Sequence, residues 1–186
     1  MISFNYESDF ILDQEAHFAS WIETIIISES KTVGEISYVF CDDEYLHAIN
    51  MQYLNHDTLT DIISFDYTEG DIISGDIFIS IERVKDNAID FKVSFEEELK
   101  RVLAHGVLHY CGYKDKSEAD EQLMRQKENE KMLISQAAEY AAMGYFISHK
   151  YTNPIVIGSD HHVMSPVYRA SSNKLVVLYI QKNYTT

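Results

Sequence analysis

The chain reads H-G-V-L-H-Y-C-G-Y-K-D from His105 to Asp115. His105 and His109 are four residues apart, and on a helix such positions lie on one face, so both imidazoles can bind the same metal ion. Gly112 is the residue type that ends a helix in the left-handed conformation, after which the chain can turn back and offer Asp115 as a third ligand. Three protein ligands leave one coordination position free, as in catalytic zinc sites. The segment therefore predicts a metal-dependent hydrolase.

Gly106 separates this segment from the H-E-x-x-H motif of zinc proteases. In that motif a glutamate, the general base, directly follows the first histidine. Gly106 stands in its place, so no carboxylate beside His105 activates water, and a protease of this kind is not expected. The alternative is that His105 and His109 only hydrogen-bond carbonyl groups at the end of a helix, with no metal between them.

The wider pattern resembles the YbeY family of bacterial endoribonucleases, which are ribosomal-RNA maturation factors. The family motif typically reads H-G-x-L-H-L-x-G-Y-D-H, and the segment 105–115 is similar to it. Two further family signatures, a T-D-V-L-S-F strand and a G-D-I strand start, resemble T-D-I-I-S-F at residues 60–65 and G-D-I-F-I-S at residues 75–80. The three occur in family order, and the resemblance covers residues 1–138.

The resemblance implies a zinc-dependent endoribonuclease, a hydrolase of phosphodiester bonds that cleaves single-stranded RNA in ribosomal RNA processing and ribosome maturation. It implies one Zn²⁺ per chain, or another divalent transition metal, bound by His105, His109 and Asp115. The family's third ligand is usually histidine, but aspartate is also a zinc ligand. The attacking group is either water or a ribose 2′-hydroxyl, and the sequence does not choose between them.

A second departure from the family pattern is at Leu54, where the family typically has an arginine thought to hold phosphate or transition-state charge. Arg101 is one turn before His105 on the metal-facing side of the helix. We expect Arg101 to supply that charge and group it with His105 and His109 as catalytic. The residues expected to contact the substrate are Ser64, Lys114 and Lys116.

Two rival functions stay open at this stage. The departures at Leu54 and Asp115 also fit a non-catalytic, metal-binding ribosome-assembly factor. Metal hydrolysis of another substrate is the second rival, against which stand the missing protease glutamate and the signatures at residues 60–65 and 75–80.

The chain is strongly acidic, with 15 Lys and Arg against 30 Asp and Glu and a net charge of −15. Nucleic-acid-binding proteins usually carry a basic surface. The basic residues near the motif could form a local one, or could be ordinary solvated helix residues: Lys100, Arg101, Lys114, Lys116, Arg125 and Lys127. The acidity predicts weak, selective RNA binding, helped by a protein partner or the ribosome. The family resemblance implies that the RNA is a single-stranded ribosomal RNA precursor and that the partner is the ribosomal small subunit or a ribosome-associated protein. No DNA partner is expected.

The length of 186 residues predicts one ordinary domain with an appendage. The apolar runs are too short for a transmembrane helix, and residues 1–5 lack the basic start and apolar run of a signal peptide. Cys41 and Cys111 are expected to be reduced thiols. We therefore expect a cytoplasmic protein with no membrane partner.

The hydrophobic pattern predicts an α+β fold, a small mixed sheet of about four strands packed with about five helices, with the metal site at the end of a central helix. Strands are expected near residues 1–6, 35–41, 61–67 and 76–80, the last two paired as a hairpin. Helices are expected to start at Asp13, at Asp42 or Asp43, and at Ser80, Ser94 and Ser117, the last one ending near Gln136.

Residues 139–186 differ in composition from the rest and contain both prolines, Pro154 and Pro166. We divide the chain into an endoribonuclease-like domain, residues 1–138, and a C-terminal extension of unknown role, residues 139–186. The extension has three open interpretations, which are a disordered segment, a peripherally packed element, or an artefact.

Overall fold

The computed structural model of the chain describes residues 1–148, 165–171 and 174–180, and the side-chain environments of residues 1–134. In chain order the elements are β1 (Ile2–Tyr6), α1 (Glu15–Ser28), β2 (Thr32–Cys41), α2 (Asp43–Ile49), a short π-helix η1 (Asn50–Leu54), β3 (Ile62–Asp66), β4 (Ile72–Ser80), α3 (Ile81–Phe91), α4 (Phe95–Tyr110), α5 (Glu118–Ser148), β5 (Ser165–Ser171) and β6 (Lys174–Ile180). The chain divides into two compact units, Met1–Met132 and Leu133–Thr186.

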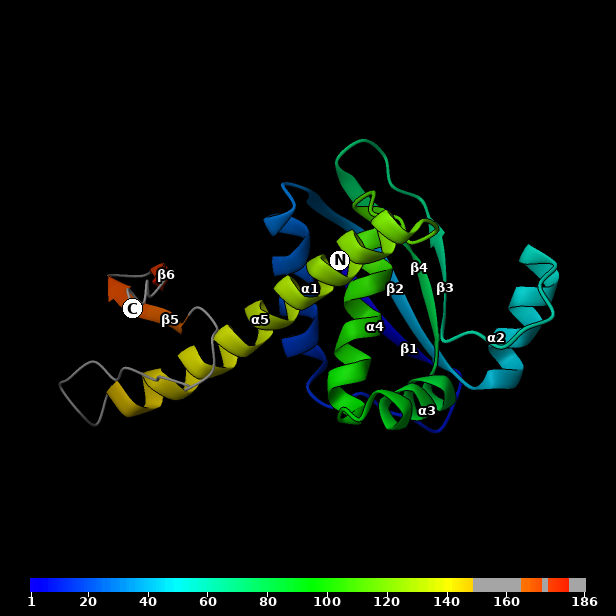
Figure 1. The fold of residues 1–186 in the computed structure, drawn as a ribbon, viewed down its shortest axis with the longest axis horizontal. Coiled ribbons are helices and arrows are strands. Elements are labelled where there is room, and N and C mark those ends of the chain that lie inside the picture. The colour runs from blue at the N-terminus through cyan, green and yellow to red at the C-terminus, as the bar shows by residue number, and fades with distance from the viewer. Residues whose placement is uncertain (149–164, 172–173, 181–186) are drawn as a thin grey trace. The chain divides into compact units, whose positions relative to one another are not determined.

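The first unit is built on a four-stranded sheet with the order β1-β2-β4-β3 (Figure 1). β1 and β4 both pair with β2 in parallel, whereas β3 and β4 pair antiparallel as a hairpin. The hairpin turns through the acidic, glycine-containing segment that links Glu69 to Ile72. The mixed sheet with its helices confirms the predicted α+β fold.

Side-chain caps start most helices where the sequence predicts them. Asp42 accepts a hydrogen bond from the Tyr45 amide, Ser80 from the Arg83 amide and Ser94 from the Glu97 amide. The expectation that Asp13 caps the first helix is wrong. α1 begins at Glu15, and its N-cap residue, Gln14, has a left-handed backbone (φ 58°) and no side-chain cap. The turn through Gln14 shifts the start of the helix past the reach of Asp13.

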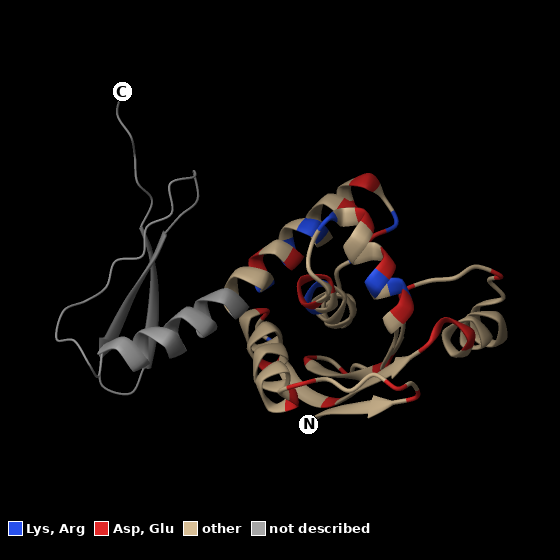
Figure 2. Ribbon diagram, turned by 90° about the horizontal axis from the view of Figure 1, so that it is seen from below, with Lys and Arg blue, Asp and Glu red and all other residues tan. Residues whose placement is uncertain are grey.

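The core of the first unit lies between one face of the sheet and the helices α1, α3 and α4 (Figure 2), whereas α2 and η1 lie against the opposite face of β4. Figure 2 also shows acidic residues, in red, on most elements and fewer basic residues, in blue. The Tyr38 hydroxyl of β2 donates to the Leu103 carbonyl of α4 across 3.1 Å, inside this core. Gly106 makes the packing close, because a Cβ there would lie 3.0 Å from the Cδ1 atoms of Ile62 and Ile77. α4 is therefore the central helix, and it carries the histidine motif.

The second unit contains strands that the sequence analysis does not predict. β5 and β6 pair antiparallel from Ser165 opposite Ile180 to Ser171 opposite Lys174. α5 continues to Ser148 instead of ending near Gln136. Residues 149–164, 172–173 and 181–186 of the extension lie outside the described residues, so its three interpretations stay open. None of the helices in the described part of the chain combines the length and hydropathy that a bilayer span needs.

Candidate metal centre

The end of α4 brings the three predicted ligands together. The Gly112 amide donates to the His109 carbonyl and the Tyr113 amide to the Leu108 carbonyl, which is the Schellman arrangement of a helix C-terminus. Gly112 has a φ of 98°, which glycine adopts without the strain that a Cβ brings. The chain reverses there, as the glycine predicts, and returns Asp115 to the two histidines.

The three ligand atoms form a compact triangle. His105 Nε2 lies 2.9 Å from His109 Nε2, and Asp115 Oδ2 lies 3.5 Å from the first and 3.4 Å from the second. Ligands held at about 2.0–2.2 Å around a tetrahedral Zn²⁺ lie about 3.3–3.6 Å apart. Two of the separations are in that range and the third is slightly shorter. The donor set of two imidazoles and one carboxylate thus fits zinc both in chemistry and in spacing.

The Nδ1 atom of each imidazole, across the ring from Nε2, has a hydrogen-bond partner. His105 Nδ1 lies 2.9 Å from Oε1 of Glu128, and His109 Nδ1 lies 3.0 Å from the Tyr113 carbonyl oxygen. A carboxylate and a carbonyl only accept hydrogen bonds, so each Nδ1 carries the proton and each Nε2 keeps its lone pair. Metal-binding histidines characteristically have such partners behind them, because these fix the tautomer and the ring orientation.

The electrostatic surroundings favour a neutral imidazole at His109. Burial lowers the pKa of His109, and the nearby His105 lowers it further. A histidine must be neutral to bind a metal, so this pKa shift helps to keep His109 ready as a ligand at neutral pH. Asp115 has a side chain that is 40% exposed, which leaves the third corner of the triangle open to solvent.

Glu128, on α5, is the residue of this site that sequence reasoning missed. It is 4% exposed, and its burial alone would raise its pKa, but the hydrogen bond from His105 and the nearby Arg125 and Arg101 outweigh burial and lower the pKa. Glu128 follows Met124 by four residues and precedes Met132 by four, and all three are buried. The spacing of these three residues on one face of the helix was the signal that could have identified Glu128 as buried. The many charged residues elsewhere on the helix obscured it.

The side chain of Arg101 forms an ion pair with Glu128. Its Nη1 lies 3.3 Å from Glu128 Oε2 and 2.9 Å from Asn129 Oδ1, and its side chain is 17% exposed. Its predicted part in holding phosphate stays a prediction. Lys114 and Lys116 flank Asp115 and are exposed, and neither has an ion-pair partner among the residues that the structure describes.

Ser64 lines a pocket of about 360 Å³ between β3 and the segment 54–60, and none of the three candidate ligands lines this pocket. Leu54 lines the same pocket, and no Lys or Arg does. The pocket also includes Ile62, whose Cδ1 approaches Gly106, the residue after His105. The pocket in which the family pattern would put an arginine is therefore neutral and adjoins the turn of α4 that carries the first ligand.

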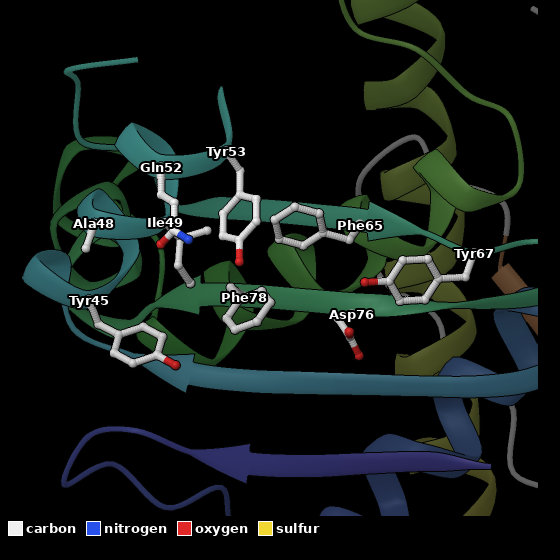
Figure 3. A pocket seen from close by; sticks show the side chains of 9 residues that line it. All are labelled: Tyr45, Ala48, Ile49, Gln52, Tyr53, Phe65, Tyr67, Asp76 and Phe78. Carbon is white, nitrogen blue, oxygen red and sulfur yellow. The ribbon is translucent and has the colours of Figure 1, made fainter. Parts of the chain in front are cut away.

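A second pocket, of about 480 Å³, lies on the face of β4 that points away from α4 (Figure 3). Asp76 and Phe78 line it, and they alternate along β4 with Ile77, which packs at Gly106. Its walls are mainly aromatic, and Figure 3 shows Asp76 between Tyr67 and Phe78. None of the predicted site residues lines this pocket.

Comparisons with known proteins show which family and which fold this chain resembles. The model of the family Endoribonuclease YbeY matches residues 3–136. The chain is 72% identical to the Endoribonuclease YbeY of Flavobacterium johnsoniae over 134 residues, which cover 72% of this chain and 96% of that protein. It is 69% identical to the protein of that name from Flavobacterium psychrophilum, with the same coverage. The solution structure of a Thermotoga maritima protein, with 23% identity, has a TM-score of 0.56 over 76% of this chain and 93% of that one, and shows the same fold.

Proposed function

The chain belongs to the Endoribonuclease YbeY family, and from that premise we propose that it is a zinc-dependent endoribonuclease that cleaves single-stranded RNA in ribosomal RNA processing and ribosome maturation. The observation that carries the proposal is the triangle of His105 Nε2, His109 Nε2 and Asp115 Oδ2, together with the acceptors behind both imidazoles. The convergence of the two Nε2 atoms and Asp115 Oδ2 argues against two histidines that merely cap carbonyl groups, because the Nε2 atoms are directed at one point and not at the backbone.

The three ligands divide the work of holding the metal. His105 and His109 present lone pairs from a rigid helix, and Asp115 contributes a negative charge from the turn that follows it. A zinc ion held there would supply a Lewis acid that polarises a phosphoryl oxygen. The exposed side of Asp115 leaves room for an RNA strand to reach the site. Another divalent transition metal would suit the same ligands.

The substrate contacts that we propose are Lys114, Lys116 and Ser64. The two lysines lie on either side of a ligand and are free to pair with phosphates of the strand. Ser64 and the neutral pocket around it offer hydroxyl and amide groups to a nucleotide beside the scissile bond. An acidic protein with so few basic contacts binds RNA weakly, so we propose that the ribosomal small subunit or a ribosome-associated protein delivers the precursor. The proposal places the enzyme in the cytoplasm, where ribosomes are assembled.

Metal content and cleavage test the proposal together. Protein purified without chelators and without a histidine tag is expected to contain about one zinc per chain by elemental analysis, and His109→Ala and Asp115→Ala are expected to lose or weaken it. The same three proteins are then compared in single-turnover cleavage of a single-stranded ribosomal RNA fragment. Wild-type protein that takes up zinc but gives no cleavage would contradict the enzymatic part, and wild-type protein that takes up no metal would contradict the zinc part.

Mass spectrometry of the product ends decides between the two nucleophiles. Attack by a ribose 2′-hydroxyl leaves a cyclic phosphate, whereas attack by water does not. A cleavage pattern that persists in His109→Ala would indicate a contaminating nuclease, so that variant is the control for both measurements.

A further inference from the structure

The buried carboxylate of Glu128 is bound on both of its oxygens. Oε1 accepts from His105 Nδ1 at 2.9 Å, while Oε2 lies 3.3 Å from Arg101 Nη1 and 3.0 Å from Arg125 Nη1. A carboxylate that is only 4% exposed would be costly without such partners. The two guanidinium groups balance its charge, and this leaves Oε1 directed at the ligand histidine.

The two arginines contribute unequally. The Arg101 side chain is 17% exposed and lies on α4, one turn before His105, whereas the Arg125 side chain is 55% exposed. Exposed ion pairs contribute little because water screens them. Both arginines hold Glu128 in place, and Arg101 is the one whose contact is less screened by water. Since its guanidinium is directed to Glu128 and Asn129, it is not directed at the three ligand atoms.

The two ligand histidines consequently differ. His109 donates to a neutral backbone carbonyl, that of Tyr113, while His105 donates to a charged carboxylate. A charge-assisted hydrogen bond is about twice as strong as one between neutral groups. It also makes the imidazole a better donor to a metal on its other nitrogen. α5 thus contributes to the metal centre although it supplies no ligand.

We propose that Glu128 is a positioning residue that fixes the Nδ1–H tautomer and the ring orientation of His105, and that Arg101 acts on the metal centre only through Glu128. The inference about metal affinity rests on the proposed function, whereas the inference about the tautomer does not. It replaces direct phosphate binding by Arg101 with an indirect role.

The tautomer can be measured without metal and without activity. Long-range ¹H–¹⁵N NMR of the full, metal-free chain at about pH 8 reports which ring nitrogen of His105 carries the proton. Wild type is expected to show the Nδ1–H form. Glu128→Gln is expected to show a mixture, because an amide can turn either its oxygen or its NH₂ group toward Nδ1. The matched control is Glu121→Gln, which removes the same charge from an exposed position on α5 and is expected to leave His105 unchanged.

Zinc affinity, measured by competition with a chromophoric chelator, is the second readout. Glu128→Gln is expected to bind zinc 10- to 100-fold more weakly than wild type, the usual effect of losing a partner behind a metal ligand. Arg101→Gln is expected to weaken zinc binding in the same direction by a smaller factor. The double variant is expected to bind like Glu128→Gln alone, because the two residues act along one path.

Three results would overturn the proposal. The first is an Nε2–H form of His105 in wild type, which needs no variant and so does not depend on how Glu128→Gln folds. The second is a tautomer that Glu128→Gln leaves unchanged. The third is an Arg101→Gln variant with wild-type zinc affinity but weaker RNA binding. If no protein binds zinc but the tautomer responds to Glu128→Gln as expected, the positioning role is upheld and only the zinc part of the proposed function fails.

Discussion

Gly75 shows what a single residue without a side chain does for this site. A Cβ at Gly75 would lie 2.4 Å from the Phe65 carbonyl oxygen and 2.6 Å from the ring and hydroxyl of Tyr110. The Tyr110 hydroxyl donates to the Phe65 and Asp76 carbonyls at 2.9 and 2.8 Å, and Tyr110 directly follows His109. The glycine of the G-D-I signature therefore lets α4 dock on the β3–β4 hairpin with its histidines in place.

We predict that Gly75→Ala lowers the free energy of unfolding by about 2–3 kcal/mol, since backbone and a packed ring must move to admit the methyl group. Urea denaturation measures the loss. Ser37→Ala, on neighbouring β2, is the control and is expected to change stability by less than about 0.5 kcal/mol. A Gly75→Ala protein as stable as wild type would show that α4 tolerates displacement at this point.

The three candidate ligands could be located from the sequence, whereas the residues that support them could not. The spacing of His105, His109 and Gly112 is local, and helix geometry converts it directly into one face and a reversal of the chain. Glu128 is 23 residues away from His105. Its role depends on how α5 crosses α4, and no local pattern encodes that crossing. The direction of the Arg101 side chain could not be predicted for the same reason, because its partner is on the other helix.

At the scale of elements, Glu29, at the C-terminal end of α1, forms hydrogen bonds that link α1 to the turn between α4 and α5 and to α5 itself. The Tyr113 hydroxyl donates to Glu29 Oε2 at 2.6 Å, Lys127 Nζ lies 3.1 Å from Oε1, and the buried Lys131 Nζ also donates to Oε1. Burial would raise the pKa of Glu29, but the hydrogen bonds from Lys131, Tyr113 and Lys127 lower it to about 2. Tyr113 also holds His109 Nδ1, so Glu29 fastens the turn that carries the third ligand.

The lowered pKa of Glu29 makes a prediction about pH. An acid whose pKa is lower in the folded than in the unfolded state stabilises the fold. For Glu29 this stabilisation is complete at pH values above its unfolded pKa of 4.5, and it is lost as the pH falls toward the folded pKa of about 2. The shift corresponds to about 3.4 kcal/mol at neutral pH, which screening by solvent reduces to about 2–3 kcal/mol. Glu29→Gln is therefore expected to be about 2–3 kcal/mol less stable than wild type at pH 7, with the gap narrowing below pH 4.

Urea unfolding at pH 7, 5 and 3 checks this expectation, with Glu23→Gln, an exposed position on the same helix, as the control. A gap between Glu29→Gln and wild type that stays constant across the three pH values would mean that packing, and not the charge of Glu29, stabilises the turn between α4 and α5.

Helix starts were more predictable than helix ends. The caps at Asp42, Ser80 and Ser94 are local hydrogen bonds that a sequence specifies. The expected end of α5 near Gln136 is wrong because the sequence from residue 137 onward is rich in alanine, which favours continued helix to Ser148. The left-handed Gln14 and the π-helix η1 were not predictable, because tertiary contacts and not intrinsic preference select such conformations.

At the scale of the whole molecule, we propose that residues 1–138 contain everything the metal centre needs. The family match ends at residue 136. The last buried residue of α5 in the described part is Met132. Next to it, the carbonyl oxygen of Lys131 accepts a hydrogen bond of 3.2 Å from the indole of Trp21. A chain that stops after residue 138 is expected to keep wild-type zinc affinity and a thermal midpoint within about 4 °C of the full chain.

Differential scanning calorimetry and chelator competition on the two chains measure this. A fall of more than about 10 °C in the midpoint, or a loss of zinc binding, would show that the extension supports the first unit and that the boundary near residue 138 is wrong.

The acidity of the whole molecule makes the final prediction, which concerns salt. Binding of single-stranded nucleic acid weakens with salt by a log–log slope of about −0.7 for each phosphate that a basic residue neutralises. If Lys114 and Lys116 are the phosphate contacts, a chain with a net charge of −15 should show a slope of only about −1.4. Fluorescence anisotropy with a labelled single-stranded RNA at several salt concentrations gives the slope.

Replacing both Lys114 and Lys116 with glutamine should bring the slope close to zero, while Lys85→Gln, at an exposed lysine of α3, should leave it unchanged. A slope steeper than about −4 would require about six neutralised phosphates, and so a basic surface that extends beyond the two lysines, and would remove the need for a partner that delivers the RNA.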